Sequence, residues 1–322
     1  MIEFIFLLGG FVLAISFGRN ILGNVFGSAI GTNMLPLKLC AILMAIFVAL
    51  GAFFGSGEVA QNMARYIHFE PPVQVLYFSL LLAGVIFLLT YLGLPLSVAQ
   101  LGMGALAGWN LATGGLVQFS DILDLAKAWL FSPLISGTIA FFVFKLARFY
   151  LKIHPVALLN RDLWVRFHMI WIGCLMAYTI GGNNLSVIVQ PFARTLSLSD
   201  FWIKSSICLF VFVGCLLASR RVVKTVSRDL FPLTPLEAMI TAFSAAMTLF
   251  LFSQGFSFLP AIPVSSGASF IGGIVGISLA KGGYGLKIKP LLWVASSWMW
   301  APFLSGLTCF VFATMMGFGR FL

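Results

Sequence analysis

Two short polar motifs interrupt apolar stretches, and their side chains are amides instead of acids or bases. The first, GRNILGN, spans residues 18–24, and the second, GGNN, ends on the adjacent Asn183 and Asn184. Asn20 and Asn24 are four residues apart, so they share one face if the stretch is helical. An amide offers donors and an acceptor without charge, so it can hold a small ion or bond a neighbouring helix. The matched occurrence of the two motifs favours the binding role.

A second pair of motifs, PLS and PVS, places serines shortly after a proline. Pro95 is followed by Ser97, and Pro263 is followed by Ser265 and Ser266. Proline fits the first turn of a helix because its missing N–H is not needed there. The serine hydroxyls and the free backbone N–H groups of that turn would then lie at the positive end of the helix dipole, which suits an anion. We therefore expect the three serines to contact an anionic ligand.

Charged side chains are scarce near these motifs. Arg19 is the charge within the first motif, and it can bind the anion directly or extend to the membrane interface. The nine carboxylates lie at the ends of apolar stretches or between them, so a coupling cation would be held by amide, hydroxyl and backbone oxygens. The four motifs hold no acid, histidine or cysteine to act as a base or nucleophile, which argues against an enzyme. No catalytic residue, cofactor or fixed metal site is predicted.

The rest of the chain is suited to a membrane. Of its 322 residues, 61% are hydrophobic and 9% are charged, whereas a soluble domain has roughly 25% charged residues. Crossing the apolar core of a bilayer takes about 20 residues of helix. We therefore expect an all-α polytopic membrane protein. The predicted spans are residues 2–17, 37–54, 73–92, 128–144, 163–180, 201–218, 236–252 and 291–315.

The net charge of +10 does not point to nucleic acid as a partner. The basic residues cluster between the predicted spans, where they set the orientation and meet anionic lipid head groups. The five cysteines lie inside apolar stretches and lack the CxxC spacing of a metal or redox site. The expected surroundings are thus membrane lipids, and we assign the protein to the inner (plasma) membrane.

Two parts of the sequence repeat one plan. Residues 95–115 align without a gap to residues 263–283, and the alignment matches the proline, a serine, the two glycines of a GxxxG, a Leu-Ala pair and the final Gly-Gly. GRN at 18–20 likewise aligns with GGN at 181–183. The sequence therefore predicts a first repeat at residues 1–147, a cytoplasmic linker at 148–162 and a second repeat at 163–322.

Loop charges indicate that the two repeats are inverted in the membrane. The loop after the second span of the first repeat holds one acid and one base, whereas its counterpart holds Arg220, Arg221, Lys224 and Arg228. Because basic loops stay cytoplasmic, equivalent loops would lie on opposite sides, with about five spans per repeat and both termini outside. Inverted repeats are typical of secondary transporters, whose substrates bind near the midplane where helices are broken. The predicted breaks are residues 18–24 with 181–186, and 95–99 with 263–268.

Taken together, these motifs resemble those of the inorganic phosphate transporter (PiT) family, and the resemblance covers nearly the whole chain. GRNILGN and GGNNLSV are similar to the family's GANDVAN-like motifs, and PLSVA and PVSSG are similar to its PVSTT-like motifs. The resemblance implies a sodium- or proton-coupled phosphate symporter built as an inverted repeat. It also implies that Asn20, Asn24 and Asn183 occupy the family's asparagine positions. The chain departs from the family where Ile21 and Asn184 replace the motif aspartate.

Three functions stay open at this point. The family default is a secondary active transporter of inorganic phosphate that works by alternating access and is coupled to Na⁺ or H⁺. Sulfate or a related oxyanion is the first alternative. Phosphate keeps a proton that it can donate to a carboxylate, while sulfate only accepts hydrogen bonds. A site that has lost its carboxylates therefore suits sulfate at least as well. A membrane subunit that has lost transport is the second alternative. A homodimer is compatible with all three.

Overall fold

The computed structural model describes residues 2–94, 96–115, 119–153, 158–224, 233–255, 261–283 and 288–318. Every regular element in these ranges is a helix, which confirms the predicted all-α class. The elements are α1 (Ile2–Gly31), α2 (Leu37–Phe54), α3 (Gly57–Met63), the 3₁₀ helix η1 (Ala64–Tyr66), α4 (Val73–Tyr91), α5 (Val98–Thr113), α6 (Phe119–Ile153), α7 (Leu158–Asn183), α8 (Ser186–Thr195), α9 (Asp200–Leu216), α10 (Arg220–Lys224), α11 (Pro235–Gln254), α12 (Ser266–Ala280) and α13 (Ile288–Met315).

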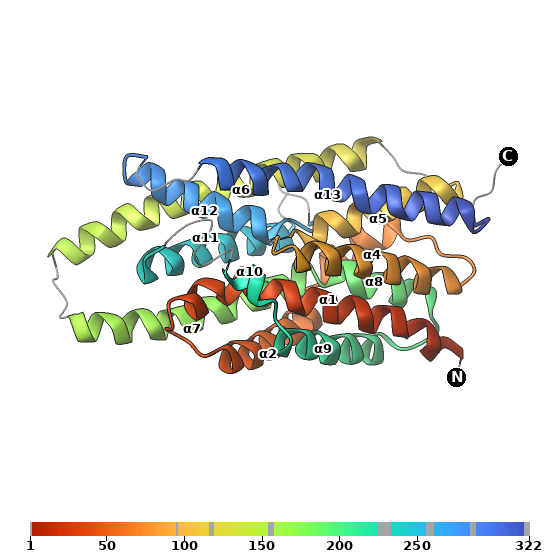
Figure 1. Cartoon of the computed structure of the whole chain (residues 1–322), viewed down its shortest axis with the longest axis horizontal. Coiled ribbons are helices and arrows are strands. Elements are labelled where there is room, and N and C mark those ends of the chain that lie inside the picture. The colour runs from red at the N-terminus through yellow and green to blue at the C-terminus, as the bar shows by residue number, and fades with distance from the viewer. Residues whose placement is uncertain are drawn as a thin grey trace.

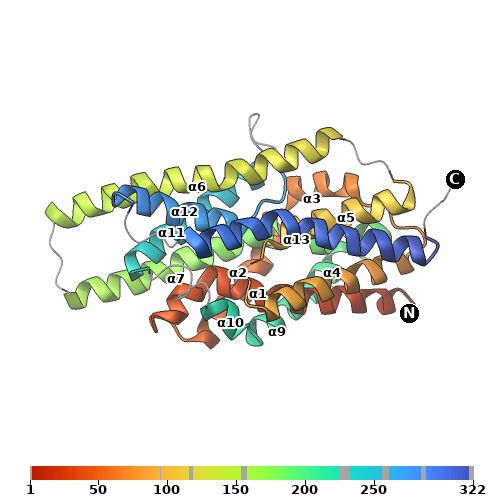
Figure 2. The ribbon, with the colours of Figure 1, turned by 45° about the horizontal axis from the view of Figure 1, so that its top comes forward.

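Seven helical stretches of the described chain are long and apolar enough to cross a membrane. They coincide with seven of the eight predicted spans to within one residue or extend beyond them, and the eighth corresponds to α9, a helix of 17 residues. Helices α6 and α13 extend along the outside of the bundle (Figure 2) and are its least buried spans. Their outward side chains, such as Phe142 and Phe303, are large and apolar, as contact with lipid tails requires. The protein is an integral membrane protein.

Helix α1 corrects one sequence-based prediction. We expected a break at residues 18–24, but α1 continues without interruption from Ile2 to Gly31. Gly18 serves close packing instead of unwinding, because a Cβ at this position would overlap the backbone of α9 at Val211 and Gly214. The counterpart in the second half is interrupted as predicted, since α7 ends at Asn183 and α8 begins at Ser186.

Helices from the two halves of the sequence pack against each other in matching pairs. α1 packs on α9 and α2 packs on α7, while α5 packs on α13 and α6 packs on α12. Glycines bring the last two pairs together: Gly104 and Gly108 meet the backbone of Pro302 and Gly306 on α13. Gly272 and Gly276 of α12 meet the backbone of α6 in the same way. The GxxxG glycines therefore serve helix packing, which is the usual role of small residues between membrane helices.

The ends of the helices give the bundle two poles. α1 begins and α13 ends at one pole, while α6 ends and α7 begins at the other (Figure 1). α1 and α7 consequently run in opposite directions, as do α6 and α13. Helices α6 and α7 also extend into the predicted linker, so 148–153 and 158–162 are helical. Pro95 of the PLS motif and Arg228 of the basic loop lie outside the described residues.

Candidate functional site

Two helices begin inside the bundle after short extended segments. α5 and α12 both start near the middle of the long axis and run towards opposite poles (Figure 1). The serines expected at these starts are N-caps: Ser97 Oγ accepts a hydrogen bond from the Gln100 backbone N–H at 3.3 Å, and Ser265 Oγ accepts one from Ala268 at 2.9 Å. Each cap satisfies one N–H group of the first turn, and the other first-turn N–H groups have no intrahelical partner because no helical turn precedes them. Two positive helix ends are thus held inside the membrane part of the protein.

The asparagines of the first motif hold the segment that leads into α5. Asn20 Nδ2 donates hydrogen bonds to Thr90 Oγ1 at 3.0 Å and to the Leu94 carbonyl at 3.2 Å. Asn24 Nδ2 donates to the Leu96 carbonyl at 3.3 Å. An extended segment inside a membrane needs such partners, because no water is present there to satisfy its carbonyls. Asn20 and Asn24 therefore brace the segment that positions the start of α5.

Asn183 does the same for the segment that leads into α12. Its Nδ2 donates to the Ile262 carbonyl at 3.0 Å, and its Oδ1 accepts from the Val264 N–H at 2.8 Å. Asn183 is fully buried. Matching asparagines in the two halves thus brace matching segments, which explains why the motif recurs. Their role as ligands stays a prediction.

Asn184 and Ser266 differ from the bracing asparagines because they are left without partners. Both are fully buried at 0% exposure. Neither the Oδ1 and Nδ2 of Asn184 nor the Oγ of Ser266 has a hydrogen-bond partner among the described residues. The aligned residues of the first half are the buried apolar Ile21 and Val98. At these two aligned positions, the unpartnered polar groups therefore belong to the second half. The first half has a different one nearby, the buried Oε1 of Gln100 in the first turn of α5.

A comparison with known sequences and structures identifies the family. The sequence model of the phosphate transporter family matches residues 17–260. The chain belongs to this family. A Methanocaldococcus jannaschii protein named as a phosphate permease is 25% identical over 306 residues, which are 95% of each chain. The sulfate permease CysP of Bacillus subtilis is 26% identical over 299 residues, which cover 91% of this chain and 82% of CysP.

A solved structure shares the fold of this family member. It is that of a sodium-dependent phosphate transporter, with a TM-score of 0.80, 19% sequence identity, and coverage of 98% of this chain and 99% of the other. The family is one of transporters and not of enzymes. Among the described residues, no group of three histidine, cysteine or acidic side chains could hold a metal ion.

Arg19 stacks on an aromatic ring in this family member, and its Nε is buried without a hydrogen-bond partner among the described residues. Its guanidinium carbon stands 4.9 Å from the centre of the Phe87 ring, and Phe87 is 47% exposed on the outer surface. A guanidinium over an aromatic face is a favourable cation–π contact. This position agrees with the alternative that Arg19 extends to the membrane interface. A contact between Arg19 and an anion stays a prediction.

Ser269 was not singled out by the sequence motifs. It is fully buried, and its Oγ has no partner among the described residues. It follows Ser266 by three residues on α12, so it lies one turn further along the helix that begins at the site. This spacing is the signal that could have identified it. Ser269 is an additional candidate for binding.

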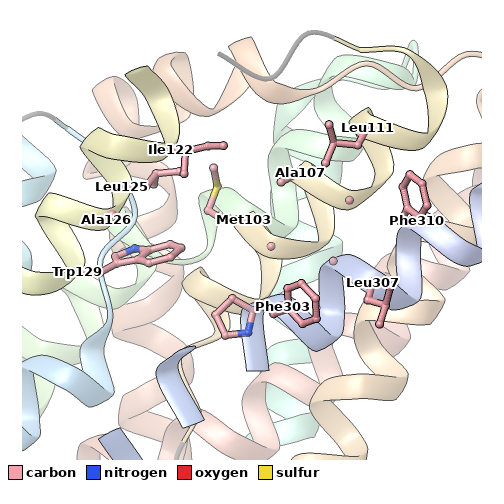
Figure 3. Close-up of a pocket in the computed structure, with 14 residues that line it drawn as sticks. Met103, Ala107, Leu111, Ile122, Leu125, Ala126, Trp129, Phe303, Leu307 and Phe310 are labelled. Carbon is pink, nitrogen blue, oxygen red and sulfur yellow. The ribbon is translucent and has the colours of Figure 1, made fainter. Parts of the chain in front are cut away.

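Two large grooves of the described structure are apolar and lie on the outside of the bundle. The first, of about 480 Å³, lies between α5, α6 and α13 (Figure 3), where Met103, Trp129 and Phe303 form part of its wall. The second, of about 510 Å³, lies between α6, α12 and α13. A multiply charged anion would lose its hydration in such a groove without gaining hydrogen bonds. The grooves suit lipid chains, and the anion site must be sought at the buried polar groups.

Proposed function

We propose that the protein is a secondary active transporter that carries inorganic phosphate across the inner membrane by alternating access. The observation that carries the proposal is Asn184, a fully buried amide whose two polar atoms lack a protein partner. A buried polar group without a partner costs about 1–3 kcal/mol, so it is expected where a ligand completes its hydrogen bonds. Ser266 supplies a second such group in the first turn of α12, at the positive helix end that favours an anion.

The other predicted site residues have supporting roles in this proposal. Ser97 and Ser265 cap the two helices, so that the free N–H groups of each first turn are held in place for the anion. Asn20, Asn24 and Asn183 brace the extended segments. Arg19 would act at the membrane surface. Phosphate would thus be held by neutral donors and helix ends in place of a charged side chain.

The proposed mechanism depends on two inverted repeats, residues 1–147 and 163–322. It is supported by the opposite directions of α1 and α7 and by the matching pairs α5 with α13 and α6 with α12. In transporters of this kind, one unit rocks against the other around a fixed central site. Basic loops at the pole where α6 ends would place that pole in the cytoplasm and both termini outside.

Coupling to Na⁺ or H⁺ is the second part of the proposal. The solved structure with this fold is sodium-dependent, which favours Na⁺. The aspartates expected from the motif resemblance are replaced by Ile21 and Asn184, so a Na⁺ site here would use amide, hydroxyl and backbone oxygens. Sodium accepts such neutral oxygens when several of them converge.

Sulfate is the second candidate substrate. The replacement of the motif aspartates by Ile21 and Asn184 favours it. A carboxylate can accept the proton that phosphate retains, and sulfate has no such proton to donate. A site whose free groups are Asn184 and Ser266 offers no carboxylate for that purpose. The similarity to a sulfate permease adds support.

Uptake by liposomes that contain only this protein tests the proposal. Labelled phosphate and labelled sulfate are each supplied with a Na⁺ gradient, with a proton gradient and with neither. Saturable phosphate uptake that depends on a gradient is expected, and the gradient identifies the coupling ion. Sulfate uptake that excess phosphate does not suppress would assign the substrate as sulfate. Absence of uptake under every condition would sink the transporter proposal and favour a membrane subunit without transport.

A further inference from the structure

We propose that Lys204 forms a second, outer anion site, at which the transported oxyanion binds before it reaches Asn184. The inference rests on the proposed transport function and adds a loading step to it. It starts from a small crevice between α2, α7, α8 and α9, whose lining includes Leu185 and Ser186. These two residues directly follow Asn184 in the chain. The crevice therefore adjoins the α7–α8 turn that carries the unpartnered amide.

The crevice has a polar lining suited to an oxyanion. Lys204 supplies a positive charge and Gln190 supplies an amide. The hydroxyls of Ser56 and Ser186 also line the crevice, but they donate to the carbonyls of Ala52 and Gly182. Its remaining lining residues are small or apolar, and no acid is among them. An ammonium has three N–H donors and a glutamine amide has two, so Lys204 and Gln190 are the donors that the crevice can offer. The site thus matches a tetrahedral inorganic oxyanion, which accepts hydrogen bonds on all sides.

Lys204 is unusually well buried for a charged residue of a membrane helix. Its side chain is 13% exposed, and its ammonium pairs at 2.8 Å with Asp200 Oδ2, whose side chain is 56% exposed. A buried lysine is retained only where a partner compensates its lost hydration. Asp200 uses one of the three ammonium donors, which leaves two for an anion, and the centre of the Phe53 ring lies 5.9 Å from the ammonium. An anion that enters can share or replace Asp200 as the partner.

The polar crevice is a property of the second half only. With the alignment of GRN to GGN extended along the chain, Ala41 stands at the position of Lys204 and Gly27 at that of Gln190. The first half therefore lacks both the charge and the amide. Asn184 also belongs to the second half, and its counterpart in the first half is Ile21. The loading site and the buried amide occur together, as expected if they serve one path.

The crevice lies towards the pole at which α1 begins. Ser197, just before α9, donates a hydrogen bond to Glu3 Oε1 of α1 at 2.7 Å, and Lys204 is one turn inside α9. In this conformation the crevice is too narrow for a water molecule. Movement of α8 or α9 would have to widen it before an anion binds. Lys204 would then attract anions from that pole and pass them inward.

Kinetics in liposomes test the loading site with one variant and a matched control. Lys204→Gln removes the buried charge, and Lys127→Gln removes a lysine that also pairs with an aspartate, Asp124, but is 55% exposed. The loading site predicts that Lys204→Gln raises the KM for phosphate about five- to tenfold with little change in kcat, and that its KM no longer rises with ionic strength. Lys127→Gln should match the unmodified protein.

Asp200→Asn keeps the proposal testable if Lys204→Gln folds poorly. It frees Lys204 from its partner, so it should lower the KM for phosphate, whereas a purely structural ion pair predicts that both variants change KM in the same direction. An unchanged KM in Lys204→Gln, or a raised KM in Asp200→Asn, would overturn the loading site. If the unmodified protein takes up no anion, the proposed transport function fails instead, so the two failures are distinguishable.

Discussion

Replacing Asn184 by leucine should make the protein more stable and less active at once. Leucine has a similar volume, and it removes two buried polar atoms that have no partner among the described residues. Each such atom costs about 1–3 kcal/mol when the site is empty. Allowing for an imperfect fit of the new side chain, we expect a gain of about 2 kcal/mol, which corresponds to a rise of several degrees in the unfolding midpoint.

The effect of Asn184→Leu on transport should be a loss. A hydrogen bond to a charged group contributes about 1.5–3 kcal/mol. Loss of one such bond to the anion corresponds to a fall of about 10- to 150-fold in kcat/KM. Thermal unfolding in detergent measures the first effect, and uptake of labelled phosphate and sulfate by liposomes measures the second.

The neighbouring Asn183 provides the matched control. Asn183→Leu introduces the same change one residue earlier, but it leaves the Ile262 carbonyl and the Val264 N–H without the bonds that Asn183 now makes. Because those groups are buried, the unfolding midpoint should fall by the equivalent of about 2–4 kcal/mol. The reasoning would be refuted if Asn184→Leu destabilised the protein as Asn183→Leu does, or if it transported normally.

Three further substitutions test the packing and the remaining site predictions. Gly108→Ala should lower stability by about 1–3 kcal/mol, because the new Cβ would overlap the Gly306 carbonyl oxygen; thermal unfolding in detergent measures this. Arg19→Gln should leave the KM for phosphate unchanged, because the guanidinium lies over the exposed ring of Phe87; a raised KM would place it at the anion. Asn24→Ala should lower the unfolding midpoint by the equivalent of about 1 kcal/mol, since one bond to the segment before α5 is lost; an unchanged midpoint would contradict the bracing role.

The positions of the spans could be predicted because they depend on composition alone. An apolar stretch of about 20 residues has few alternatives to a membrane helix, and seven of the eight predicted stretches match membrane-length helices to within a residue or lie inside them. The caps of α5 and α12 were also predictable, because Ser97 and Ser265 act on backbone groups only three residues away. Such local interactions leave a local signature in the sequence.

The break predicted at residues 18–24 failed for a nonlocal reason. Gly18 and the asparagines of GRNILGN permit an unwound helix, but they equally permit a straight one that packs closely and bonds a neighbouring segment. The choice depends on α9, whose backbone approaches Gly18, and on the carbonyls of Leu94 and Leu96, which accept from Asn20 and Asn24. These partners are far away in the chain, so the motif alone could not decide.

The sequence by itself determined that this is a helical membrane protein, which family its motifs resemble, and which amides and serines lie in its interior. Composition and short-range spacing carry that information. Only the tertiary structure separated the bracing asparagines from the free one, because the difference between Asn183 and its neighbour Asn184 is whether a distant backbone lies within hydrogen-bonding distance. It likewise brought Lys204 of α9 to the crevice beside that free amide. Hydrogen bonds and burial are properties of the packed chain, and two adjacent, identical residues can therefore have opposite roles.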